Sequence, residues 1–302
     1  MNKSCLIGFL MCSAFSLVVQ AATDGAHITK TISQIERKKG IKRTIQYRPD
    51  GNDFVCVNGK NRYTRALYGG ITDFRIETSD RPVFAAYKPK DSKHICFRLQ
   101  CGNQSIALDS LKFCEARYRA GRRTYRLTDP LLGKGELNIS VLAFPDAEGG
   151  IWRFTMKDMP EGALLHCYIS EIRAKNLSRN GDMGADRADS FDAPQLPKEQ
   201  KHYKLSLDGT TAYIVVEDQE LRLPALVEGT SLYDKSEKWR SEIESSLQIS
   251  TPDPYFNPLG GALAAAADGI WDGKIWLHGA IGWRSQLNGW RAAYIGDFIG
   301  WH

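Results

Sequence analysis

Short strand-like segments, separated by turn residues, fill the chain from about residue 43 to residue 227. Apolar, β-branched or alternating residues predict strands over residues 42–47, 53–57, 71–76, 83–87, 95–99, 111–118, 137–141, 151–156, 165–172, 203–207 and 213–216. Pairs such as Asp50-Gly51 and Asp208-Gly209 mark the turns between them. This pattern is typical of a β-sandwich or a barrel, and the lack of a fixed repeat disfavours a propeller or a solenoid. We therefore expect a β-sandwich domain over residues 23–227.

The pattern becomes helical after Pro224. Apolar residues at spacings of seven, four and four predict a helix over residues 231–247, with a stripe made of Leu232, Trp239, Ile243 and Leu247. Asn257-Pro258 followed by an alanine run predicts a second helix over residues 259–270. A third helix is expected over residues 275–287. Residues 228–302 should therefore form a linker helix and the start of a helical domain.

A long polar segment interrupts the strand pattern between residues 176 and 201. It has no clear periodicity and contains Pro194 and Pro197. Such segments are either flexible insertions or functional loops, and the composition favours an insertion over a loop that overhangs a ligand site.

The first residues resemble a secretory signal peptide. Lys3 precedes an uncharged apolar run over residues 5–19, and Val19-Gln20-Ala21 resembles a cleavage site. We expect residues 1–22 to be removed and the protein to be periplasmic or secreted. An uncleaved anchor is the alternative, and no later stretch is long and apolar enough to span a bilayer.

Five cysteines follow the signal peptide: Cys56, Cys96, Cys101, Cys114 and Cys167. Most lie in apolar, strand-like runs, which favours small buried hydrophobic side chains. A Cys96–Cys101 or Cys101–Cys114 disulfide is the alternative, and the sequence does not choose between these pairings. Because the chain has no CxxC pair, a structural zinc site is not expected, and no cofactor is predicted.

The charge balance and the motifs exclude several classes of function. Lysine plus arginine number 40 against 35 aspartate plus glutamate, and a net charge of +5 is too small to predict nucleic-acid binding. The basic run over residues 36–43 is interpreted as a solvated linker or strand edge. The sequence has no HExxH motif, P-loop or GxSxG motif. It leaves the oligomeric state open.

Aromatic and polar residues alternate near the end of the sequence. Five of the seven tryptophans lie after residue 270, and Gly-Trp-Arg occurs at 282–284 and 289–291. Aromatic faces stack on sugars while neighbouring polar groups bind hydroxyls, so we predict a saccharide site. The candidate substrate-binding residues are Trp276, His278, Trp283, Arg284, Trp290, Arg291, Asp297, Trp301 and His302. A tryptophan stripe packed into a core is the alternative.

The same region resembles a known family. The stretch Asn257-Pro258-Leu259-Gly260-Gly261, the segments 276–280, 283–284 and 289–291, and the final Gly300-Trp301-His302 carry the resemblance. They are similar to the entry into the helical barrel of large secreted Bacteroidetes proteins of polysaccharide-utilisation loci, a family of unknown function related to six-hairpin glycosidases. Residues 68–74 and 80–82 resemble its N-terminal β-domain.

The resemblance implies a β-sandwich followed by an (α/α)6 barrel that handles complex glycans. It supplies no nucleophile or general acid. Such a barrel needs about twelve helices, whereas only about three helical segments fit before His302. We therefore expect a mainly-β chain that carries the first helices of a truncated barrel.

Three functions are compatible with these features. The first is the N-terminal portion of an exported glycoside hydrolase-like protein that acts on complex polysaccharide and is inactive by itself. The second is a stand-alone β-sandwich carbohydrate-binding module without catalysis. The third is a structural surface protein without sugar affinity. Asp268, Asp272 and Asp297 lie in the right region for catalytic carboxylates, but capping or surface roles are favoured for each.

Overall fold

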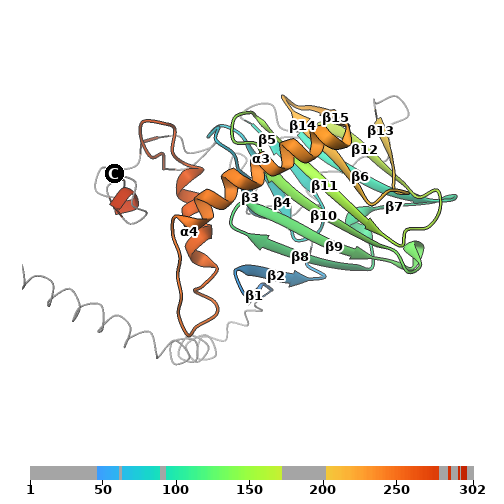
Figure 1. Ribbon diagram of the computed structural model, residues 1–302, viewed down its shortest axis with the longest axis horizontal. Helices are drawn as coiled ribbons and strands as arrows, with labels where there is room; N and C mark the ends of the chain where they lie inside the picture. Colours follow the sequence, from blue (N-terminus) through green and yellow to red (C-terminus); the bar gives the residue numbers. More distant parts are fainter. Residues whose placement is uncertain are drawn as a thin grey trace, which may run out of the picture.

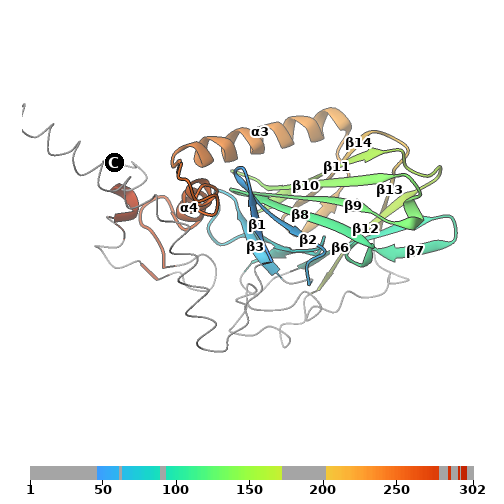
Figure 2. The same ribbon diagram turned by 90° about the horizontal axis from the view of Figure 1, so that it is seen from below.

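The strands of the computed structural model form two antiparallel sheets, which lie in two layers with helix α3 (Leu226–Ser245) along one of them (Figures 1 and 2). The structure describes residues 46–60, 63–88, 93–171, 202–278, 285–286, 292 and 294–297. The predicted mainly-β fold of two packed sheets is confirmed, whereas an (α/α)6 barrel remains a prediction.

One sheet has eight strands and the other has seven. The first contains, in spatial order, β1 (Arg48–Asp50), β2 (Asp53–Val57), β8 (Phe113–Arg119), β9 (Arg122–Thr128), β10 (Glu136–Ala143), β11 (Gly149–Lys157), β14 (Thr211–Glu217) and β15 (Glu220–Arg222). The second contains β13 (His202–Ser206), β12 (Leu164–Glu171), β6 (Lys93–Cys101), β5 (Phe84–Tyr87), β4 (Arg75–Ser79) and β3 (Tyr63–Tyr68), with β7 (Gln104–Ala107) paired to β6. Two short 3-10 turns, Leu108–Ser110 and Pro130–Leu132, complete the sandwich.

The core lies between the two sheets. Strands β8 and β9 bury every second residue, as expected when one face of a sheet packs inward. Trp152 of β11 is fully buried and meets Phe84 of β5 edge to face, with ring centroids 5.7 Å apart. Phe97 of β6 packs on Phe84 at 5.6 Å, and on Phe154 of β11 at 5.5 Å. Aromatic contacts therefore join the two layers.

The structure confirms most of the predicted strands but moves or adds several. Residues 71–74 form a turn, and β4 begins only at Arg75. Gln46 and Tyr47 lie outside strands, and residues 42–45 lie outside the described residues. The additional strands, which the sequence did not predict, are β1, β3, β7, β9 and β15.

Two of the three predicted helices are present. Helix α3 and helix α4 (Leu259–Asp268) confirm the first two. The third is wrong in its described part, because residues 271–278 form a turn closed by isolated bridges. Its glycines explain the difference, since each costs a helix about 1 kcal/mol.

The buried face of α3 is displaced by one residue from the predicted stripe. The fully buried positions are Gly229, Tyr233, Ser236 and Arg240, while Leu232, Trp239 and Ile243 are half-buried. The reason is that α3 packs on the outer face of the eight-stranded sheet (Figure 2), where an apolar cluster that includes Leu142, Ile151 and Tyr233 lies beside polar side chains. Tyr233 binds Ser140 of β10 at 2.6 Å, and Arg240 donates to the carbonyl oxygen of Ala120 at 2.9 Å.

All five cysteines are free thiols in the structure. Four are buried and Cys101 is half-buried, which confirms the prediction of small apolar side chains for the four. Burial raises the pKa of Cys96 and of Cys114 to about 12, so both stay protonated and unreactive near neutral pH.

Candidate functional site

A tight hairpin follows helix α4 and carries two tryptophans. Trp271 and Trp276 form an antiparallel bridge, and their ring centroids lie 4.5 Å apart. The Asp272 carboxylate accepts hydrogen bonds from the backbone N–H groups of Lys274 (3.0 Å) and Ile275 (2.8 Å). Gly273 completes the turn at φ +93°, a conformation that favours glycine. We call residues 270–278 the tryptophan hairpin.

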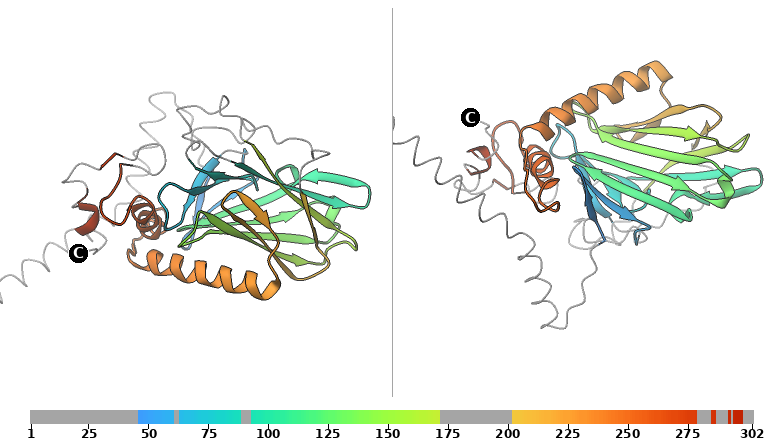
Figure 3. Two further views of the ribbon diagram at one scale, coloured as in Figure 1. Left: turned by 90° about the horizontal axis from the view of Figure 1, so that it is seen from above. Right: turned by 60° about the horizontal axis from the view of Figure 1, so that its bottom comes forward.

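The tryptophan hairpin is closed by its own backbone, and the residue just before it packs against strand β3 of the sandwich. Leu277 is buried, and its N–H donates to the carbonyl oxygen of Ile270 at 2.9 Å. Gly269, just before the hairpin, lies against the ring of Tyr68 in β3. A Cβ atom at Gly269 would lie only 2.3 Å from Cγ of Tyr68, so this contact requires glycine. Figure 3 shows α4 beyond the ends of the strands, beside the last turns of α3.

The structure places three of the nine predicted site residues. Trp276 is half-buried and His278 is exposed, and both belong to the tryptophan hairpin. Asp297 is exposed in a separate helical stretch, residues 294–297. The other six, Trp283, Arg284, Trp290, Arg291, Trp301 and His302, lie outside the described residues. The part of the predicted site that can be seen is therefore one aromatic hairpin with a histidine beside it.

Sequence reasoning missed Trp271 as the partner of Trp276. The signal was present, because Asp272-Gly273 is a strong hairpin turn pair. The expected helix over residues 275–287 concealed it, since a helix would have placed the two rings on different turns.

Asp268, the last residue of α4, carries the most perturbed carboxyl group near the hairpin. Burial raises the pKa of Asp268 to about 6. Part of the population is then protonated near neutral pH, and a protonated carboxyl can donate a hydrogen bond to a hydroxyl or ether oxygen.

Asp268→Asn should stabilise the protein in a pH-dependent way. The folded pKa of about 6 lies above the ordinary value of 3.8, so the aspartate favours folding less as the pH rises from about 4 to 6. We expect the free energy of unfolding of the variant to rise by about 1–2 kcal/mol at pH 7.5 and by almost nothing at pH 4. A shift of about two pKa units corresponds to somewhat more than this, and partial contact of the carboxyl group with solvent reduces the effect. Urea unfolding at both pH values measures this.

The control for that experiment is Asp234→Asn, because Asp234 is exposed on α3. It should change the free energy of unfolding little at either pH. An equal gain for Asp268→Asn at pH 4 and at pH 7.5 would contradict a raised carboxyl pKa.

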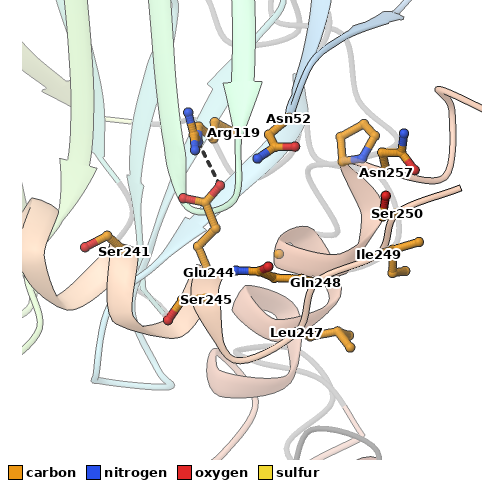
Figure 4. Close-up of a pocket in the computed structure, with 12 residues that line it drawn as sticks. Asn52, Arg119, Ser241, Glu244, Ser245, Leu247, Gln248, Ile249, Ser250 and Asn257 are labelled. Atoms are coloured by element: carbon orange, nitrogen blue, oxygen red, sulfur yellow. Dashed lines mark hydrogen bonds and ion pairs between the residues drawn. The ribbon is translucent and has the colours of Figure 1, made fainter.

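A second candidate site is a cavity of about 510 Å³ at the elbow between α3 and α4 (Figure 4). Its lining comes from the β1–β2 turn, the β8–β9 hairpin, the end of α3 and the segment leading into α4. The polar lining residues include Asn52, Arg119, Ser241, Glu244, Gln248 and Asn257.

The charged groups of this elbow cavity are already paired. One oxygen of Glu244 accepts a hydrogen bond from Arg119 at 2.7 Å, and the other accepts one from Arg240 at 2.7 Å. Burial disfavours the charged carboxylate, but the two arginines outweigh burial and lower the pKa of Glu244. The cavity therefore joins the helices to the sandwich and offers no unsatisfied charge to a ligand.

Within the described ranges, no group of histidine, cysteine, aspartate and glutamate side chains is arranged to hold a metal ion. Neither described helix combines the length and the apolar character that crossing a membrane requires.

One family matches part of this chain. Residues 89–217 match the family described as "Domain of unknown function (DUF4450)". The matched range begins just before β6 and ends with β14, so it covers much of the sandwich and stops before α3 and the tryptophan hairpin. No curated protein matches the chain.

Proposed function

We propose that this chain is the carbohydrate-binding N-terminal part of an exported glycoside hydrolase-like protein that acts on complex polysaccharide. The observation that carries the proposal is the Trp271–Trp276 pair, which lies at the end of the sandwich beside the exposed His278. Paired indole rings offer apolar faces on which the C–H faces of a sugar can stack. Imidazole and carboxyl groups next to them can bind the hydroxyls.

Two further features support a saccharide as the ligand. Asp268, with its raised pKa, directly precedes the hairpin. The sequence continues the pattern of aromatic and planar polar residues with Trp283, Arg284, Trp290 and Arg291. The motif as a whole resembles that of the polysaccharide-utilisation family.

We further propose that residues 1–302 bind polysaccharide without hydrolysing it. Ordinary glycoside hydrolysis requires two carboxyl groups, roughly 5–10 Å apart, that are free to act on the substrate. The Asp272 carboxylate accepts the hydrogen bonds that hold the turn of the hairpin, so Asp272 is not free to act as the second catalytic carboxyl group beside Asp268. We expect no release of reducing sugar from polysaccharides that this chain binds.

Trp276→Ala should weaken saccharide binding about fivefold to tenfold, because stacking on one aromatic ring contributes on the order of 1 kcal/mol beyond burial. Calorimetry with soluble neutral plant polysaccharides measures the affinity, and intrinsic fluorescence reports contact with indole rings. Trp239→Ala is the control, since Trp239 is also half-buried but belongs to α3 and not to residues 270–278. Unchanged affinity in a folded Trp276→Ala variant would rule out the hairpin as the sugar site.

The second candidate function is a stand-alone binding module. The hydrophobic core favours this function. Among the described residues, the two sheets and α3 bury the core side chains by themselves, as expected for a domain that folds alone. The intact mass of the protein from its source cells separates the two functions. A mass far above 33.8 kDa supports an N-terminal part of a larger enzyme, whereas a mass near that of residues 23–302 supports the module and signal cleavage.

A further inference from the structure

The outer face of the eight-stranded sheet contains a polar groove that α3 leaves open. Helix α3 contacts β10, β11 and β14, and Figure 1 shows it crossing one side of the sheet, with β8 and β9 beyond it. The groove has a volume of about 360 Å³ and lies across β8, β9, β10 and β11. The sequence alone does not predict this groove, because its lining comes from four different strands.

The register of the strands builds this groove from two rows of side chains. The first row crosses the sheet as Arg117, Thr124, Ser140 and Arg153. The second row, next to it, crosses as Glu115, Arg126, Asn138 and Thr155. Since residues two apart on a strand share a face, hydroxyl, amide and guanidinium groups collect on one surface.

Three of the four arginines in the groove are neutralised by carboxylates. Arg117 binds Glu115 and Asp50, each at 2.8 Å. Arg122 binds Glu237 of α3 at 2.8 Å. Arg126 lies 3.4 Å from Glu115 and 3.5 Å from Glu136. These ion pairs leave little net charge for a ligand.

Arg153 is different because, within the described part of the chain, it has no carboxylate partner. The Cζ atom of Arg153 lies 3.9 Å from the ring centroid of Tyr233, the shortest of the cation–π contacts in the sandwich. Tyr233 is itself buried and fixed by its 2.6 Å hydrogen bond with Ser140. Stacking restrains the guanidinium while leaving its in-plane N–H donors available.

We propose that this groove binds an acidic oligosaccharide, and that Arg153 holds the carboxylate of one uronate residue. The planar guanidinium matches a carboxylate with two parallel hydrogen bonds. Thr124, Asn138 and Thr155 line the groove beside it and can bind sugar hydroxyls. The inference deepens the proposed function, on which it rests for the ligand being a glycan, and it adds a second surface distinct from the tryptophan hairpin.

The pattern of charges favours a uronate over a densely charged polyanion. Among the described residues of the groove, only Arg153 lacks a carboxylate partner, and Glu115 in the adjoining row would repel a chain that carries a charge on every unit. An isolated carboxylate flanked by neutral hydroxyls fits one unpaired arginine flanked by neutral polar side chains.

Arg153→Gln tests this proposal against a matched pair of ligands. Calorimetry compares a neutral oligosaccharide that carries one uronate residue, such as glucuronosyl-xylotriose, with its methyl ester, which has the same sugars but no charge. We expect the wild type to bind the acid about tenfold or more tightly than the ester, and Arg153→Gln to lose this preference while it binds the ester as before. Lys157→Gln is the control, because Lys157 is exposed on the same face of β11, outside the groove.

The outcomes separate this proposal from the previous one. Equal affinity of the wild type for acid and ester would overturn the uronate site, while binding of neutral polysaccharide sensitive to Trp276→Ala would leave the tryptophan hairpin intact. Stronger binding of dextran sulfate, weakened equally by Arg153→Gln and Lys157→Gln, would also overturn it, since that behaviour reflects general charge attraction. A preference for the acid that only Arg153→Gln abolishes supports it.

Discussion

Replacing Arg240 with methionine is expected to lower the free energy of unfolding by about 3 kcal/mol. This is the lower end of the loss that follows when one partner of a buried ion pair is removed. The Arg240 side chain is only 6% exposed. It donates to Glu237 at 2.7 Å, to Glu244 at 2.7 Å and to the carbonyl oxygen of Ala120 at 2.9 Å. Methionine fills similar space but offers no donor, so two carboxylates lose their shared cation and a backbone carbonyl loses its partner.

Urea unfolding at neutral pH measures this loss, with Lys238→Met as the control. Lys238 is exposed on the same helix, and its replacement should change the free energy of unfolding by less than about 0.5 kcal/mol. Arg119 and Arg122 still neutralise the two glutamates in part, which limits the loss. Similar values for the two variants would show that α3 is held by its apolar contacts alone.

The same residues explain why the sequence placed α3 correctly but misplaced its buried face. Helical spacing of Leu232, Trp239 and Ile243 was sufficient to predict the helix. Periodicity assumes that a helix packs on an apolar surface, whereas α3 lies on a mixed sheet face. Tyr233 packs there on apolar side chains and also contacts Ser140 and Arg153. The buried stripe therefore includes Ser236 and Arg240. Because these side chains are polar, the spacing of apolar residues in the sequence does not identify this stripe.

Strand β9 was missed for a related reason. Its sequence, Arg-Arg-Thr-Tyr-Arg-Leu-Thr, appears too charged for a strand of a sandwich. The structure buries Arg123 completely between the sheets, where it binds Tyr47 at 2.6 Å and the carbonyl oxygen of Ser79 at 2.7 Å. Apolar strands such as β5 and β14 were predicted because their residues follow the usual rule. A buried arginine breaks that rule and can be recognised only from its partners.

The candidate sites show a similar division. Composition and spacing were sufficient to locate the aromatic segment, because its tryptophans are close together in the linear sequence. The groove around Arg153 was not predictable, since Arg117, Thr124, Ser140 and Arg153 meet only through the pairing register of four strands. Alternation tells which residues share a face of one strand, but it does not fix which residue of the next strand lies opposite.

Trp152→Ala should have the largest effect of the variants considered, a loss of about 3–5 kcal/mol in free energy of unfolding. Trp152 is fully buried and contacts Phe84 and Phe97 of the opposite sheet. Alanine would leave a cavity in the layer that joins the sheets. Trp152→Phe is the control and should cost much less, because it keeps a ring and removes an indole N–H that has no acceptor among the described residues. Thermal and urea unfolding measure both, and equal losses would contradict the cavity explanation.

Trp152 also provides a standard against which the binding experiments can be judged. It is adjacent to Arg153 on β11, but successive side chains of a strand point to opposite faces, so one residue serves the core and the other the groove. Trp152→Ala should weaken binding of the oligosaccharide with one uronate and of its methyl ester by the same factor, because it reduces the folded fraction. Arg153→Gln should weaken binding of the acid alone. If both variants instead reduced both affinities in parallel, the loss in Arg153→Gln would arise from folding, and the groove would lose its assignment as a uronate site.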